Sequence, residues 1–255
     1  MSYKFCIMDI MTNNSVITQK NNTKKSLSFL TWLLIIGGMI ATGGVWFFAK
    51  PVLPVADTTP PGFSVQGVAI NQTSGYVDYH NLTSNGIDFT YLRATTGASF
   101  SDDDYQSNYD RASAAKLKVG SIQVYDSSTN ADTQAQYFID KVGDKIGQLP
   151  IAIYVTQDQV SAQDSKERLA TLIQTLTAHY EKAVVIYTTP DVKKQLASTI
   201  SQTKYWLISS HANDKKVTNQ FIQYSEDHTI GTGLKAIKMP TSVFNGTEKE
   251  FEEIK

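Results

Sequence analysis

The chain has 255 residues, enough for one or two domains with a sizeable core. Its 23 basic and 24 acidic residues nearly balance, which excludes a strong overall field for nucleic acid. The single cysteine, Cys6, excludes an internal disulfide framework.

The first long apolar segment runs from Ser26 to Ala49 without a charged residue. As a helix it would be roughly 36 Å long, enough to cross a hydrocarbon core of about 30 Å. Trp32 lies near one end and Trp46 near the other, as is typical of interfacial aromatic residues. We therefore expect a transmembrane signal-anchor helix at residues 26–49. A cleaved signal peptide is the alternative, although such apolar regions are usually shorter.

The flanking charges predict the orientation of this helix. Residues 1–25 carry four lysines and one acid, so we expect a cytoplasmic N-terminal tail and an extracellular C-terminal domain. Residues 50–62 hold four of the seven prolines and are expected to form an extended linker. The predicted protein is therefore a single-pass protein of the cell membrane, with its external domain at residues 63–255.

Segments that favour strands alternate with segments of helical spacing from residue 67 onward. We expect strands at 67–71, 89–95, 118–125, 151–156, 183–188, 205–209, 220–224 and 235–239. We expect helices at 103–116, 131–147, 161–181 and 190–199. This order predicts an α/β fold, a modified (β/α) barrel of about eight strands and five helices. Chemistry in such barrels lies where the strands end at their carboxyl side.

An ordered set of short motifs runs through this domain. In chain order they are Gly67-Val68, Gly75, Val77-Asp78-Tyr79, FTYLRATTG at 89–97, AKLKVG at 115–120, Leu149-Pro150, VIYT at 185–188, YWLI at 205–208, FIQYS at 221–225 and VFNG at 243–246. The set resembles glycoside hydrolase family 25, the lysozymes (muramidases) that cleave the muramyl linkage of peptidoglycan. The resemblance covers about residues 67–246 and implies a cell-wall glycan as the partner.

The departures from the family pattern concentrate at its catalytic and lining positions. The family's acids fall on Ala69, Thr96, Tyr154, Thr156 and a position near Pro240, and its Tyr-His pair falls on Ile122 and Gln123. Glycosidic cleavage needs a proton donor and a group that stabilises the oxocarbenium-like centre. Neither tyrosine nor threonine is acidic enough to donate near neutral pH. We therefore expect a domain that is degenerate at the catalytic positions and is catalytically impaired.

Other carboxylates follow strand ends and are candidates to replace the lost acids: Asp126, Asp158 and Glu226. Solvated surface charge is the alternative role for each. His211 and His228 also lie near strand ends but lack an acidic partner at metal-ligand spacing, so we expect neither a metal nor a cofactor.

Aromatic residues near the strand ends are candidate glycan-binding residues, because apolar faces of sugar rings pack against aromatic rings. These residues are Tyr125, Tyr154, Tyr187, Trp206 and Tyr224. Packing inside the barrel is the alternative role for each of them.

Three functions follow from this pattern. The first is a membrane-anchored, lysozyme-like module that binds peptidoglycan, another cell-wall glycan or an envelope protein partner without turnover. The second is an active muramidase that uses relocated carboxylates. The third is an envelope protein-interaction module without glycan binding. Fold alone does not decide among them.

Overall fold

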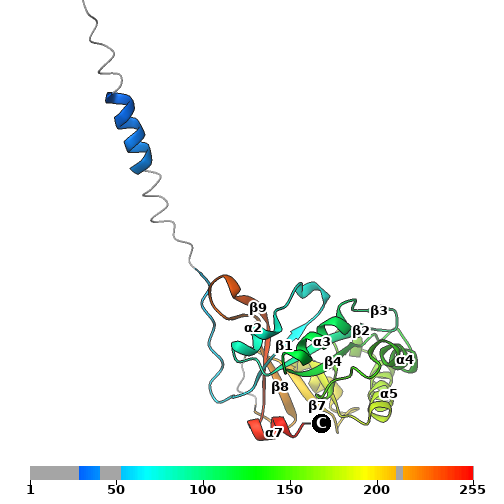
Figure 1. Cartoon of the computed structure of the whole chain (residues 1–255). Coiled ribbons are helices and arrows are strands. Elements are labelled where there is room, and N and C mark those ends of the chain that lie inside the picture. The colour runs from blue at the N-terminus through cyan, green and yellow to red at the C-terminus, as the bar shows by residue number, and fades with distance from the viewer. Residues whose placement is uncertain (1–28, 41–52, 211–214, 255) are drawn as a thin grey trace, which may run out of the picture. The chain divides into compact units, whose positions relative to one another are not determined.

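The computed structural model describes residues 29–40, 53–210 and 215–254 (Figure 1). The chain divides into two units, Met1–Val52 and Leu53–Lys255. Residues 29–40 form a helix with exposed side chains, and the rest of the predicted membrane segment lies outside the described residues. Among the described residues, no helix combines the length and hydropathy needed to cross a membrane.

The second unit is a closed barrel of β-strands. The sheet order is β1-β9-β8-β7-β6-β5-β4-β2-β3, and β1 also pairs with β2, so every strand except β3 joins the ring. The strands are β1 Gln66–Ile70, β2 Phe89–Thr96, β3 Phe100–Ser101, β4 Lys118–Val124, β5 Ile151–Tyr154, β6 Val184–Thr188, β7 Lys204–Ile208, β8 Asn219–Ile230 and β9 Ile237–Phe244. The predicted barrel is therefore confirmed, and all eight predicted strands are present at nearly the predicted positions.

Helices follow most of the strands and cover the barrel from outside (Figure 1). They are α2 Tyr79–Ser84, α3 Tyr105–Ala114, α4 Ala131–Val142, α5 Gln163–Tyr180, α6 Pro190–Leu196 and α7 Glu248–Glu252, with 3-10 turns at Gln72–Ser74, Asp158–Val160 and Gly233–Lys235. The four helical segments located from the sequence are confirmed. The short helices α2 and α7 were not predicted, since each buries too few apolar residues to give a helical period.

The last two strands differ from the expected parallel pattern. β9 runs antiparallel to both of its neighbours, β8 and β1. β8 pairs with β7 only as far as Gln223, but continues alongside β9 to Ile230. The two strands therefore extend past the carboxyl ends of the parallel strands. We call residues 224–239 the arm, and the end of the barrel from which the arm projects the mouth.

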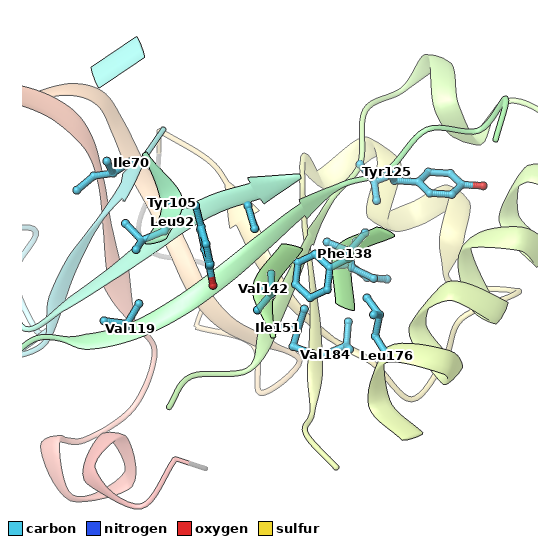
Figure 2. Packing of buried hydrophobic residues seen from close by; sticks show 14 of the residues in the cluster. Ile70, Leu92, Tyr105, Val119, Tyr125, Phe138, Val142, Ile151, Leu176 and Val184 are labelled. Atoms are coloured by element: carbon cyan, nitrogen blue, oxygen red, sulfur yellow. The ribbon is translucent and has the colours of Figure 1, made fainter. Parts of the chain in front are cut away.

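Two apolar layers lie on opposite faces of the barrel wall. The outer layer fills the space between strands and helices, where Phe138, Ile151, Leu176 and Val184 lie close together (Figure 2). The inner layer is aromatic and includes Phe89, Tyr91, Trp206 and Phe221. Because both faces are buried, the strands are nearly continuous apolar runs, as expected for parallel strands.

Two glycines make room for this aromatic interior. A Cβ atom at Gly67 would lie 2.2 Å from the Phe89 ring, and one at Gly120 would lie 2.3 Å from the Tyr91 ring. Tyr91 in turn packs against Trp206, with ring centroids 4.6 Å apart. The rings thus occupy the space that side chains at both glycines would take, and the barrel interior is a filled core.

The expected linker contributes to the barrel domain from Leu53 onward. The Asp57 amide donates to the Thr229 carbonyl oxygen at 3.0 Å, and the Thr229 amide donates to Asp57 Oδ2 at 2.7 Å. The Gly233 amide donates to the Pro54 carbonyl oxygen at 3.0 Å. Farther along, Lys215 Nζ donates to the Gly62 carbonyl oxygen at 3.2 Å. Residues 53–62 therefore form a strap that is hydrogen-bonded to the arm at one end.

The floor of the barrel, opposite the mouth, is closed by α7. Phe251 is buried, and its ring centroid lies 5.6 Å from that of Phe89 and 5.4 Å from that of Phe244. A capping box at Thr247 starts the helix, and Lys118 Nζ donates to the carbonyl oxygens of Phe251 and Glu252 at 2.8 Å. The C-terminal helix is therefore fixed at both ends.

We predict that Phe251→Ala lowers the free energy of unfolding of residues 53–255 by about 3–5 kcal/mol, because it leaves a cavity among the aromatic rings. Urea unfolding followed by tryptophan fluorescence measures the change. Leu234→Ala is the control, since Leu234 is 96% exposed and its loss should leave the unfolding midpoint unchanged. A similar midpoint for Phe251→Ala and wild type would show that α7 is not part of the core.

Candidate functional site

A pocket of about 350 Å³ opens at the barrel mouth. Its walls come from the carboxyl ends of β1, β2, β4, β5 and β6 and from β9. The lining residues are Ala69, Ile70, Asn71, Arg93, Thr96, Ile122, Val124, Tyr154, Tyr187 and Pro240. We call this the mouth pocket. Its position is the one at which barrels of this kind carry their chemistry.

The mouth pocket brings together five of the seven positions that the family resemblance singled out, whereas Thr156 and Gln123 lie outside its lining. Ala69, Thr96, Tyr154 and Pro240, which match acidic positions of the family, all line it. Ile122, which matches the tyrosine of the Tyr-His pair, lines it as well. Residues from six different strands thus meet in one place, and the lining contains no carboxylate.

The tyrosines of the pocket are neutral hydrogen-bonding groups. Burial raises the pKa of Tyr187, with smaller contributions from Tyr154 and Glu226. Burial also raises the pKa of Tyr154, followed by the negative charges of Glu226 and Asp158. Both phenols therefore keep their protons at any physiological pH. They offer hydrogen bonds but cannot act as general acids near neutrality.

An aromatic stack forms one wall of the pocket. The Tyr154 and Tyr187 ring centroids are 5.0 Å apart, and Tyr187 stacks on Trp206 at 3.9 Å with an interplanar angle of 17°. The Trp206 Nε1 donates to Ser242 Oγ at 3.0 Å, and the Tyr187 hydroxyl donates to Gln223 Oε1. Trp206 is buried, so it supports the two half-buried tyrosines from behind.

The structure gives the other candidate aromatics packing roles. Tyr125 is completely buried in the outer layer, and its hydroxyl donates to the Ser165 carbonyl oxygen at 2.6 Å (Figure 2). The Tyr224 hydroxyl donates to Gln66 Oε1 at 3.1 Å, and its ring packs against His228. Tyr125, Trp206 and Tyr224 therefore present no free ring face to the mouth pocket. Tyr154 and Tyr187 line the pocket, and their glycan-binding role stays a prediction.

Asp126, the first candidate acid, holds a loop together. Its carboxylate accepts hydrogen bonds from the Ser128 amide at 2.9 Å, the Ser128 hydroxyl at 2.7 Å and the Thr129 hydroxyl at 2.7 Å. These bonds, those from Thr129 and Ser128 foremost, lower the pKa of Asp126. A carboxyl with a lowered pKa is a poorer proton donor near neutral pH, so Asp126 is unsuited to general acid catalysis.

Asp158 and Glu226 lie outside the pocket lining. Asp158 accepts a hydrogen bond from the hydroxyl of Thr156, which lies just after β5 at the second position assigned to an acid. The Thr156 hydroxyl is therefore used in a contact within this loop. Glu226 is exposed at the base of the arm. Both charges act on the Tyr154 phenol, which places them within electrostatic range of the pocket.

Arg93 is the pocket residue that the sequence analysis did not single out. It is the one charged side chain of the lining, and it lies on β2 between apolar neighbours. Its Nη2 is 3.4 Å from Asp102 Oδ2, and the Asp102 side chain is buried. A charged residue within an otherwise apolar strand that runs to the mouth was the signal in the sequence. Its partner, Asp102, lies beyond β3 and could not be identified from spacing.

Of the two histidines near strand ends, the structure describes His228. His228 is buried against Tyr224, and burial lowers its pKa. His211 lies outside the described residues. Within residues 29–40, 53–210 and 215–254, no group of three His, Cys, Asp or Glu side chains is placed to hold a metal ion.

Comparison with known sequences identifies relatives of this domain. The sequence profile described as glycosyl hydrolases family 25 matches residues 68–232. An autolytic lysozyme from Clostridium acetobutylicum is 23% identical over 172 residues, which are 65% of this chain and 52% of the relative. Lysozyme M1 from Streptomyces globisporus is 30% identical over 89 residues, which are 34% of this chain and 29% of the relative. The chain thus spans about half of the first relative and under a third of the second.

Solved structures share the fold. A family 25 glycosyl hydrolase from Bacillus anthracis superimposes with a TM-score of 0.70 at 23% identity, covering 78% of this chain and 96% of that structure. A lysozyme from Streptomyces coelicolor superimposes with a TM-score of 0.63 at 20% identity, covering 76% and 96%. At these identities the similarity shows the fold alone.

We predict that Asp126→Ala lowers the melting temperature near neutral pH, because the loop loses three hydrogen bonds to a carboxylate. The pKa of Asp126 is lowered in the folded state, so this stabilisation is present above the unfolded pKa of about 3.9 and is lost as the pH falls through the folded pKa. Thermal melts of wild type and variant should therefore converge as the pH falls below the folded pKa of Asp126. A difference that is independent of pH would contradict this role.

Proposed function

Because the chain belongs to glycosyl hydrolase family 25, we propose that its barrel domain binds peptidoglycan, or another cell-wall glycan, without cleaving it. One observation carries this proposal. The mouth pocket, where the family resemblance places the catalytic acids, is lined by alanine, threonine, tyrosine and proline at those positions and holds no carboxylate.

The missing acids remove the chemistry but leave a binding site. General acid catalysis contributes about 10²–10⁴-fold to such reactions, and electrostatic stabilisation contributes more. Protonation of the leaving oxygen requires an acid at the scissile bond, and the oxocarbenium-like centre requires a carboxylate or the substrate's own acetamide to stabilise it. The half-buried rings of Tyr154 and Tyr187 still form a pocket wall on which a sugar ring can pack. The domain therefore keeps the surface that recognises glycan and lacks the groups that cleave it.

The alternative is an active muramidase that uses relocated carboxylates. One observation favours it, because Asp158 and Glu226 lie within electrostatic range of Tyr154. Three observations weigh against it. Neither acid lines the pocket, Asp158 accepts a hydrogen bond from Thr156, and the pKa of the third candidate, Asp126, is lowered instead of raised.

We predict that residues 53–255 bind purified peptidoglycan but release no reducing ends above background. Tyr154→Ala should weaken binding about tenfold, or about 1.4 kcal/mol, because it removes one face of the aromatic wall. Sedimentation with the insoluble polymer measures binding, and a reducing-sugar assay measures cleavage. Tyr137→Ala, on the outer helix α4, is the matched control and should bind as wild type does.

A restored variant separates the alternatives. The variant combines Ala69→Asp, Tyr154→Asp and Thr156→Glu, which return carboxylates to positions that the family resemblance assigns to acids. Release of reducing ends by this variant would support an intact binding groove. Release by the wild type, abolished by Asp158→Asn or Glu226→Gln, would favour the active muramidase. Absence of binding to any wall glycan would favour the protein-interaction module.

We also propose that residues 26–49 anchor the chain in the cell membrane, with the barrel domain outside and residues 1–25 in the cytoplasm. The absence of charge from Ser26 to Ala49 and the lysines before it support this proposal. The strap begins at Leu53 beside the arm, so the chain leaves the barrel domain at the arm.

We predict that the full chain sediments with membranes, resists extraction by high salt and dissolves in detergent. Protease added outside intact cells from which the wall has been removed should digest the barrel domain. Deletion of residues 26–49 should move the protein to the soluble fraction. A mature protein that lacks residues 1–49 and is found in the medium would show instead that the segment is a cleaved signal peptide.

A further inference from the structure

Arg93 is only partly neutralised within the protein. Its side chain is 24% exposed, and its one ion pair is the 3.4 Å contact between Nη2 and Asp102 Oδ2. The Nε atom is buried and has no hydrogen-bond partner among the described residues. A guanidinium presents five donors in a planar fork, so the terminal nitrogens of Arg93 keep donors beyond the one that Asp102 accepts.

Asp102 is satisfied largely by the backbone. Its Oδ2 accepts from the Gln72 amide at 2.7 Å, and its Oδ1 accepts from the Asp104 amide at 3.2 Å. These bonds are shorter than the contact with Arg93, so the 3-10 turn after β1 and the segment after β3 stabilise the carboxylate independently of the arginine. Arg93 is therefore held in place at the pocket wall by a partner that accepts a hydrogen bond from only one of its nitrogens, Nη2.

The rest of the pocket adds donors and no opposing carboxylate. Thr96 and Tyr154 contribute hydroxyl groups, and Asn71 contributes an amide. Asp158 and Glu226 act on the Tyr154 phenol but lie outside the lining, and exposed charges are screened over about 8 Å at physiological salt. The pocket therefore places hydrogen-bond donors around a guanidinium that is partly buried. Such a site favours a negatively charged ligand.

We propose that the mouth pocket selects an anionic sugar, whose carboxylate or phosphate is held by Arg93 while its ring packs on Tyr154 and Tyr187. This inference rests on the proposed glycan-binding function and names the ligand class for the same site. Removal of the acids thus has two effects. It abolishes proton donation, and it converts a pocket that would repel an anionic residue of a cell-wall polymer into one that attracts it.

The test compares sugars that differ in charge. Glucuronate, glucose 6-phosphate and glucose are titrated separately into the full chain in nonionic detergent, and binding is followed by ligand-observed NMR. We expect either or both anionic sugars to bind about tenfold more tightly than glucose, as charge-assisted hydrogen bonds allow. Binding of glucuronate would indicate a carboxylated glycan as the ligand, and binding of glucose 6-phosphate would indicate a phosphorylated one.

Two variants keep the test decisive. Arg93→Gln should abolish the preference for the anionic sugar, and Arg168→Gln, which removes an arginine paired with Asp164 outside the pocket, should retain it. Thr96→Glu leaves the Arg93–Asp102 pair intact and places a carboxylate in the pocket, so it should also abolish the preference if Arg93→Gln fails to fold.

The outcomes also distinguish this inference from the function on which it rests. Equal affinity for charged and neutral sugars would overturn the anion selectivity and leave glycan binding standing. An anion preference that survives both Arg93→Gln and Thr96→Glu would overturn the assignment to this pocket. Peptidoglycan binding by wild type without binding of either anionic sugar would likewise overturn it, whereas loss of all glycan binding would overturn both proposals.

Discussion

The barrel closes because β1 hydrogen-bonds to β2 on one side and to β9 on the other. Closure removes both sheet edges and creates an interior that must be filled. The aromatic rings around Tyr91 and Trp206 fill it, and Gly67 and Gly120 leave the space that those rings need. A filled interior confines any ligand to the mouth, where the strands end.

Framework and site follow different physical requirements in this domain. The glycines, the apolar strand faces and the capping residues of α7 maintain a fold shared with active lysozymes at low sequence identity. At the positions that the family resemblance assigns to acids, the residues are only partly buried, unlike the core residues Ile70 and Ile122 beside them. Ala69, Tyr154 and Pro240 can therefore stand at these positions while the barrel stays closed. Arg93 is the one charged side chain in the lining of the resulting pocket.

The strap and the arm show how segments without regular periodicity become part of the domain. Asp57 pairs with Thr229 through backbone and side chain, although 172 residues separate them in sequence. Such a contact satisfies backbone groups at the edge of a two-stranded arm that would otherwise face solvent. A proline-rich stretch that resembles a free spacer is in this way fixed to the barrel from Leu53.

The sequence by itself determined the order of strands and helices and the barrel class, because apolar periodicity and strand-end motifs are local properties. It could not decide which strand-end tyrosine faces the mouth. Both faces of these strands are apolar, so the order of apolar and polar residues does not show which side chains point into the barrel. Only the strand register places Tyr187 in the pocket and Tyr125 in the outer layer. The tertiary structure was also needed to show that β9 runs antiparallel and that Arg93 pairs with Asp102. Each feature depends on a contact between separate segments, and the sequence does not show which segments meet in space.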